Sequence, residues 1–179
     1  MKQTKQQFKS FKKQAGITLM EVIGSLLVIG LVVSGALSLF GSADSSQKGN
    51  QMLADINAIR SAVKGMYSGQ GGYGATSLNS VLISAKKIPS SMTTSGTTIT
   101  HSMNGTLTVT GATALFNIAI TNVPTDVCVQ LVSNATAGWT SIQVGSATAF
   151  TTFPVSPATA AGATYCAASN ANTLTFISG

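Results

Sequence analysis

This chain of 179 residues has few charged side chains and few residues of the types that carry most catalytic chemistry. Charged residues make up 8% of it. Its single histidine, His101, lies in a threonine-rich stretch, which favours a packed or surface residue over a catalytic base. Its two cysteines, Cys128 and Cys166, are too few and too isolated for a zinc site. We therefore expect no enzyme, no metal site and no cofactor.

The distribution of charge argues against a nucleic-acid-binding protein, despite a formal net charge of +6. Five lysines lie in residues 1–16, without an acidic residue among them. The rest of the chain holds five basic and four acidic residues, a net charge of +1. These residues are Lys48, Arg60, Lys64, Lys86 and Lys87, and Glu21, Asp44, Asp55 and Asp126. A basic surface that attracts nucleic acid is therefore not expected outside residues 1–16.

One apolar segment of 24 residues, 17–40, dominates the N-terminal part, and Glu21 is its only ionisable side chain. At about 1.5 Å per residue, a helix of this length spans roughly 36 Å, enough for a hydrocarbon core of about 30 Å. With the lysines before it, the segment predicts a membrane helix with a cytoplasmic leader. A carboxylate inside such a segment costs about 2.5 to 3.5 kcal/mol near the centre, which indicates a functional role for Glu21.

Two simpler interpretations compete with a functional carboxylate. A secretory signal peptide also has a basic and an apolar region, and Gly41-Ser42-Ala43 resembles a cleavage site of small residues. The apolar stretch is longer than the usual 7 to 15 residues or so of a signal peptide, and a glutamate near its start would weaken translocation. A plain single-pass anchor is the other interpretation, and it leaves Glu21 unexplained.

The residues around Glu21 resemble the cleavage site of the type IV pilins, bacterial filament subunits that are cut between a glycine and a hydrophobic residue. The matching residues are Gly16, Ile17, Thr18, Leu19, Glu21 and Val22. The resemblance implies cleavage after Gly16, N-methylation of Ile17, and a charge pair between Glu21 of a docked subunit and the Ile17 amine of its neighbour. Neither group can stay unpaired in an apolar filament core, and the pair would set the axial register. Ile17 departs from the phenylalanine or methionine that is commoner there.

The leader of 16 residues, the extended middle of the chain and the C-terminal cysteines look like the type IVb branch, which includes bundle-forming and conjugative pili. This resemblance implies a structural subunit of a homo-oligomeric pilus, in the inner membrane as a precursor and then extracellular on a Gram-negative cell. The implied partners are a prepilin peptidase, an inner-membrane platform protein, an assembly ATPase and an outer-membrane secretin. Adhesion, cell aggregation, DNA transfer and phage reception are all compatible with such a subunit.

Two other functions fit the same features. A minor pilin or type II secretion pseudopilin would share the N-terminal segment, but the C-terminal cysteines and the lack of an acidic calcium-binding loop favour a pilin. A monomeric membrane-anchored adhesin would share the anchor and would leave no filament.

The apolar segment is expected to continue as one helix over 17–68, because no proline interrupts it up to Tyr67. Five apolar residues recur at spacings of three and four in its second half, which predicts a stripe that packs on a core. They are Met52, Ile56, Ile59, Val63 and Met66. The glycine-rich run 69–74 fits GxGxxG, but a helix precedes it rather than a strand, so a dinucleotide site is not expected.

Residues 69–179 are expected to form a small head domain. Its predicted strands and short helices, together with the long N-terminal helix, indicate an α+β fold with an antiparallel sheet. Asn104-Gly105 separates two strand-like runs and is a strong hairpin signal. We predict a three-residue loop with a bulge, because a two-residue loop would place apolar residues of one strand opposite threonines of the other. Further strands are predicted over 115–121, 139–144 and 174–177, and helices over 77–87, over 124–133 with Asn122 or Thr125 as cap, and from Ser156-Pro157.

Cys128 and Cys166 fall on the two later helices of this scheme. Two cysteines in an exported chain predict one disulfide, since no other intramolecular pairing exists. Closing a loop of about 39 residues contributes roughly 4 kcal/mol in the chain-entropy model. The disulfide would therefore close the C-terminal region of a small, glycine-rich head.

Overall fold

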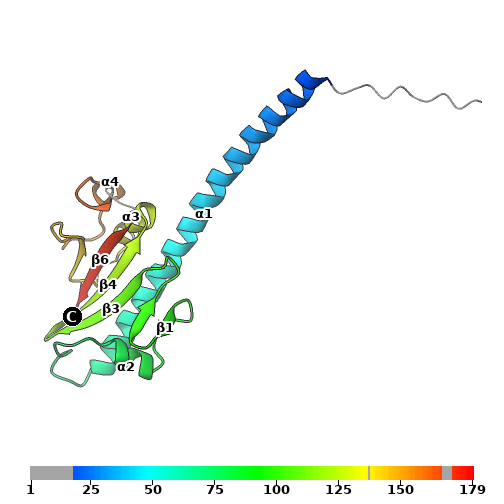
Figure 1. The fold of residues 1–179 in the computed structure, drawn as a ribbon. Coiled ribbons are helices and arrows are strands. Elements are labelled where there is room, and N and C mark those ends of the chain that lie inside the picture. Colours follow the sequence, from blue (N-terminus) through cyan, green and yellow to red (C-terminus); the bar gives the residue numbers. More distant parts are fainter. Residues whose placement is uncertain (1–17, 137, 167–170) are drawn as a thin grey trace, which may run out of the picture. The chain divides into compact units, whose positions relative to one another are not determined.

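The computed structural model describes residues 18–136, 138–166 and 171–179, without the side chains of residues 35–42. The chain divides into two compact units, Met1–Gly41 and Ser42–Gly179. Helix α1, Leu19–Tyr67, is continuous from the first unit into the second, as predicted (Figure 1). The leader 1–16 and Ile17 lie outside the described residues. Within the described part of the chain no helix is apolar over enough residues to cross a membrane. The predicted span over 17–40 includes Ile17 and the side chains of 35–40, which lie outside the described residues.

The second half of α1 packs through the predicted stripe. Met52, Ile56, Ile59 and Val63 are buried and Met66 is partly buried, all in one hydrophobic cluster with the sheet. Burying side chains of this size contributes about 1.5 to 3 kcal/mol each. The stripe is therefore a core-facing surface, and the prediction is confirmed.

The unit Ser42–Gly179, called the head unit below, contains a six-stranded antiparallel sheet in the order β1-β2-β3-β4-β6-β5. The C-terminal strand β6 lies between β4 and β5, so the chain end is held inside the sheet (Figure 1). The strands are β1 Thr93–Ser95, β2 Thr98–Thr100, β3 Thr106–Ala112, β4 Leu115–Val123, β5 Ser141–Val144 and β6 Asn172–Ser178. This arrangement confirms the α+β class.

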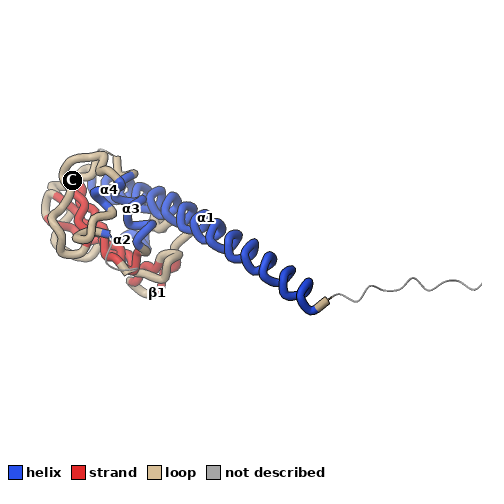
Figure 2. The backbone as a smooth tube through the Cα atoms, turned by 90° about the horizontal axis from the view of Figure 1, so that it is seen from above, coloured by secondary structure: helices blue, strands red, loops and turns tan. Residues whose placement is uncertain are grey.

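The strand register places apolar residues in rows across one face of the sheet. Val109 pairs with Ile118, Ile118 with Phe176, and Phe176 with Ile142, and all four are buried. Side chains alternate between faces along a strand, so the residues before and after each of these four in its own strand lie on the opposite face. The apolar rows and the α1 stripe belong to one core cluster, and α1 therefore covers the apolar face (Figure 2).

The predicted hairpin at Asn104-Gly105 is confirmed. The His101 N–H donates to the Gly105 carbonyl at 3.0 Å, which leaves a loop of three residues, and the Asn104 N–H closes the turn on the His101 carbonyl at 3.0 Å. Asn104 has φ 58°, the left-handed conformation that the bulge requires. As predicted, the apolar residues are aligned, with Ile99 opposite Leu107.

The short helices are α2 Asn79–Ser84, α3 Thr125–Ser133 and α4 Pro157–Ala160. Ser156 caps α4 as predicted, accepting from the Thr159 N–H at 3.2 Å. The predicted cap of α3 was wrong: Pro124 holds the cap position, and the Asn122 side chain donates to the Met103 carbonyl instead. Cys166 was also wrongly placed on a helix continuous with α4, which ends at Ala160.

Candidate assembly site

The first turn of α1 is stabilised by two residues of the cleavage motif. The Glu21 N–H donates to the Thr18 carbonyl at 3.0 Å and lies 3.4 Å from Thr18 Oγ1. Thr-x-x-Glu is the pattern of a capping box, in which a threonine starts the helix and a glutamate follows three residues later. The cleavage motif by itself did not indicate this structural role. A carboxylate in the first turn is also favoured by the helix dipole, by about 0.3 to 1 kcal/mol.

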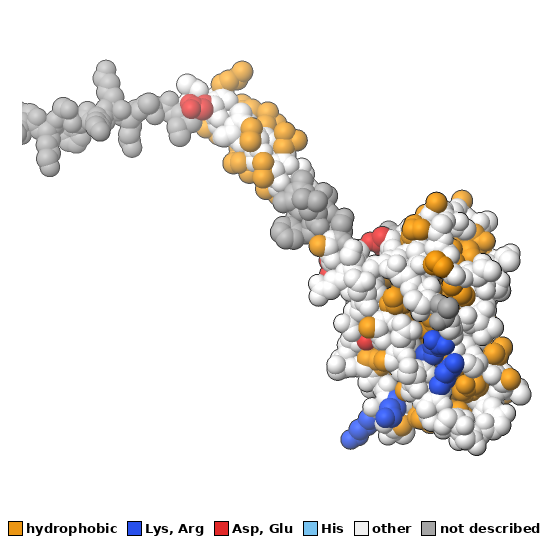
Figure 3. Space-filling model, turned by 180° about the vertical axis from the view of Figure 1, so that it is seen from behind, with side chains coloured by type: hydrophobic (Ala, Val, Ile, Leu, Met, Phe, Trp, Pro, Cys, Tyr) orange, Lys and Arg blue, Asp and Glu red, His pale blue; other side chains and the backbone are white. Residues whose placement is uncertain are grey.

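The apolar surface of α1 between Leu19 and Val33 is exposed. Leu19 is 79% exposed, Met20 81% and Leu31 74%. In Figure 3 groups of orange hydrophobic side chains lie along this part of the helix, with white atoms between them. Apolar patches of this kind mark sites that another molecule covers. A Cβ added at Gly24 or Gly30 would meet no atom within 4 Å, so both positions leave room for a neighbouring helix to approach.

Glu21 is exposed at the start of this apolar surface. Gly16 and Ile17, the predicted cleavage and methylation residues, lie outside the described residues, so their distance to Glu21 is not defined. The predicted charge pair joins two different subunits, and a single chain does not test it.

The predicted disulfide is present. The sulfur atoms of Cys128 and Cys166 are bonded, and the Cα atoms lie 5.7 Å apart. Both residues are fully buried, and the bond ties α3 to the segment that follows α4. The Asn172 amide donates to the Val123 and Cys166 carbonyls at 3.2 and 3.3 Å, which holds the same segment against the start of β6. The C-terminal region is thus closed on the sheet.

Arg60 joins α1 to the far end of the chain, a contact that the sequence patterns did not show. Its Nε donates to Ser178 Oγ at 3.0 Å, and its guanidinium also donates to the Gly138 carbonyl. The guanidinium carbon lies 4.8 Å from the centre of the Trp139 ring, a cation–π contact. Burial lowers the pKa of Arg60, and the nearby Tyr73 raises it to a lesser extent. The long helix is therefore fixed to the C-terminal strand.

The model of the family described as PilS N terminal matches residues 46–179, about three quarters of the chain. This protein belongs to the PilS N-terminal family. The match starts after the cleavage motif and the exposed apolar surface, so it supports a pilus-related protein independently of them. No curated protein matched the chain in a separate comparison.

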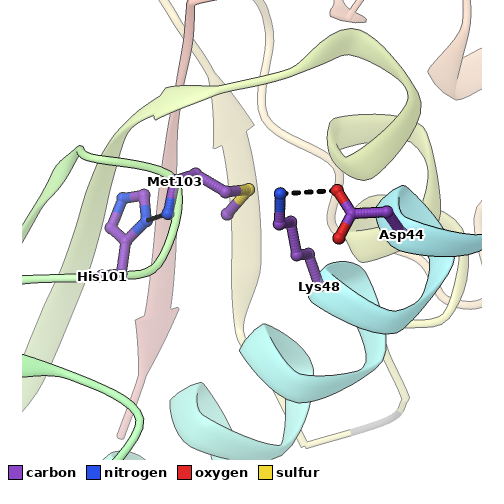
Figure 4. Close-up of polar contacts among 4 residues, drawn as sticks. All are labelled: Asp44, Lys48, His101 and Met103. Carbon is purple, nitrogen blue, oxygen red and sulfur yellow. Dashed lines mark hydrogen bonds and ion pairs between the residues drawn. The ribbon is translucent and has the colours of Figure 1, made fainter. Parts of the chain in front are cut away.

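His101 of this PilS-family chain is a packed residue, as the composition favoured. It is 3% exposed, and Figure 4 shows its ring bonded to the backbone of Met103. Nε2 lies 2.9 Å from the Thr121 carbonyl, and Nδ1 accepts from the Met103 N–H at 3.3 Å. A carbonyl accepts and an N–H donates, so only the neutral ring with its proton on Nε2 satisfies both. Burial lowers the pKa of His101, and the bond to the Thr121 carbonyl partly opposes this.

The glycine-rich run after α1 has a packing role. Gly111 of β3 faces the loop, and a Cβ there would lie 2.2 Å from the Tyr73 carbonyl oxygen. The Tyr73 N–H donates to the Thr113 carbonyl at 2.7 Å, and the Tyr73 ring lies 4.8 Å from that of Phe116. The run therefore closes the end of the sheet next to α1.

In the part of the chain that the structure describes, no cluster of acidic, histidine or cysteine residues could hold a metal ion.

Proposed function

We propose that this protein is the structural subunit of a type IV pilus, of the type IVb kind, and that it assembles through the N-terminal part of α1. The observation that carries this proposal is the exposed apolar surface of α1, with one carboxylate in its first turn. Membership of a pilus-related family supports it. Identical helices packed side by side would cover this surface and remove it from water. Burial of apolar area stabilises such an assembly by about 25 cal/mol per Å².

In this proposal, Glu21 acts once the leader has been removed. Cleavage after Gly16 creates an amine on Ile17, which is then N-methylated. An incoming subunit carries this positive charge into an apolar bundle, where an unpaired charge is costly. Glu21 of a subunit already in place neutralises it. Because the two groups are four residues apart, the pairing shifts the neighbouring helices by a fixed amount along the filament.

The same proposal sets the order of events in the cell. The precursor resides in the inner membrane, where a prepilin peptidase removes residues 1–16. A platform protein and an assembly ATPase then add the subunit to the filament, which leaves through an outer-membrane secretin. The filament would serve adhesion, aggregation or DNA transfer through exposed surfaces of the head unit.

The first test is the N-terminus of the mature protein, measured by intact-mass spectrometry of sheared surface material and of the membrane fraction, in which an uncleaved precursor would remain. We expect a chain that begins at methylated Ile17, and an unprocessed precursor from Gly16→Leu. Gly24→Leu is the matched control, since it makes the same change within α1 and should be cleaved normally. A mature chain that begins at Asp44 would instead support a signal peptide and contradict the proposal.

Electron microscopy of the sheared material separates the remaining alternatives. A major pilin gives abundant filaments made mainly of this chain. A minor pilin or pseudopilin would be a rare component of such filaments or form none on the surface. A monomeric anchored adhesin would stay with the cell membrane and leave no filament.

A further inference from the structure

A shallow hollow on the head unit has one acidic wall. Its volume is about 390 Å³, and it lies where the start of this unit's part of α1 meets α3 and α4. Its lining includes Ser45 and Ser46 of α1, Asp126, Gln130 and Ser133 of α3, and Pro157 of α4. Asp126 is exposed, and its Oδ1 accepts from the Val127 N–H at 2.9 Å. We call this feature the Asp126 hollow.

The carboxylate of the Asp126 hollow has no ion pair within the described part of the chain. The one ion pair among the described residues joins Asp44 to Lys48, so no cation of this chain's described part neutralises Asp126. Ser133, which also lines the hollow, has a buried Oγ without a hydrogen-bond partner among the described atoms. An exposed carboxylate without an ion pair accepts hydrogen bonds from an ammonium group.

The opposite end of the head unit presents such groups. Lys86 and Lys87 follow α2 directly, and both are exposed. Lys86 has φ 54°, so the backbone reverses here and the two side chains stand on a tight turn. In Figure 3 the Lys and Arg side chains gather in the lower part of the head unit. We call residues 86–87 the lysine turn.

The hollow and the lysine turn are too far apart to meet within one molecule. The hollow includes Ser46, whereas α2 packs in the core cluster with Val63, near the end of α1 (Figure 1). Seventeen helical residues separate these two positions, or about 25 Å at 1.5 Å per residue. A contact between two different patches of identical subunits does not close as a two-fold dimer, and it repeats either as a closed ring or as an open helical array.

We propose that the lysine turn of one copy of this chain docks into the Asp126 hollow of the next copy. This inference rests on the proposed function, since it places a head-to-head contact within the filament. The lysine ammonium group pairs with the Asp126 carboxylate at the wall of the hollow. This contact would fix the axial position of neighbouring subunits at a second place, in addition to the charge pair of Glu21.

The test is zero-length carbodiimide cross-linking of wild-type filaments, which joins a carboxylate to an amine in contact. Mass spectrometry should find Asp126 linked to Lys86 or Lys87 in filaments, and at least tenfold less of this link in detergent-dissociated subunits. Links between subunits that use other carboxylates but omit Asp126 would overturn the inference. If wild-type cells form no filament of this chain, the proposed function fails and the inference fails with it.

Charge-reversal variants supply a second, independent readout. Lys86→Glu/Lys87→Glu should reduce sheared filaments at least tenfold, and adding Asp126→Lys should restore them. Lys64→Glu is a control for the change in net charge and should assemble normally. Asp126→Asn keeps the acceptor for the Val127 N–H and loses only the charge, so it tests pairing without disturbing the start of α3. Normal filament yield from both the double lysine variant and Asp126→Asn would contradict the docking.

Discussion

Replacing Gly111 by alanine should strongly destabilise the head unit. The added Cβ would lie 2.2 Å from the Tyr73 carbonyl oxygen and 2.8 Å from that of Gly74, and both neighbours are backbone atoms. The loop would have to move away from β3. This would break the Tyr73-to-Thr113 hydrogen bond of 2.7 Å and the Thr113-to-Gly74 bond of 2.8 Å.

The size of the effect follows from these contacts. Two hydrogen bonds contribute about 1 kcal/mol each, and the contact between the Tyr73 and Phe116 rings adds about 0.5 to 1.5 kcal/mol. The free energy of unfolding should therefore fall by about 3 kcal/mol. With a urea slope of about 1 to 3 kcal/mol per molar, the midpoint should fall by about 1 M or more.

The assay is urea unfolding of the purified protein, followed by the fluorescence of Trp139, the only tryptophan, which is 5% exposed. Gly65→Ala is the matched control, because a Cβ there meets no atom within 4 Å and alanine favours the helix by about 0.5 to 1 kcal/mol. The same chemical change should thus have opposite effects at the two sites. An unchanged midpoint for Gly111→Ala would refute the close contact between loop and strand.

Two further predictions concern the head unit. Cys166→Ser should lower the free energy of unfolding by about 4 kcal/mol and reduce the amount of subunit in cells, measured by immunoblot; labelling of both thiols by an alkylating agent without reduction would show that the bond does not form. Acidification should also destabilise the fold through His101. Its pKa is lowered in the folded state, so its contribution is complete above the unfolded pKa of about 6.5 and is lost as the pH falls toward the folded pKa. The urea midpoint should drop more between pH 7.5 and 5.5 for wild type than for His101→Gln, and equal drops would rule out this role.

Local patterns in the sequence predicted the elements whose residues lie close together in the chain. The spacing of Met52, Ile56 and Ile59 indicated which side of α1 is buried, and Asn104-Gly105 indicated both the hairpin and its loop. The disulfide followed from the presence of only two cysteines.

Contacts between distant parts of the chain were not predictable in this way. The insertion of β6 between β4 and β5 depends on pairing between strands that no local pattern specifies. Arg60 and Ser178 are 118 residues apart, and nothing in either neighbourhood signals their contact. The cap of α3 was missed because the Asn122 side chain binds a carbonyl of the hairpin loop rather than the helix. Of the candidate assembly site, the sequence predicted both Glu21 and the apolar segment 17–40, and the structure adds how far the side chains between Leu19 and Val33 are exposed.

The most direct test of the central claim is the filament yield of Glu21 variants, measured in the shear fraction beside an immunoblot for processed subunit in the membrane. Glu21→Ala and Glu21→Gln should be cleaved normally and form at least tenfold fewer filaments than wild type, because the incoming Ile17 amine meets no countercharge. Glu21→Asp keeps the charge at shorter reach and should retain part of the yield. Loss of cleavage would assign Glu21 to recognition by the peptidase. Abundant normal filaments from Glu21→Ala would contradict assembly by charge pairing along α1.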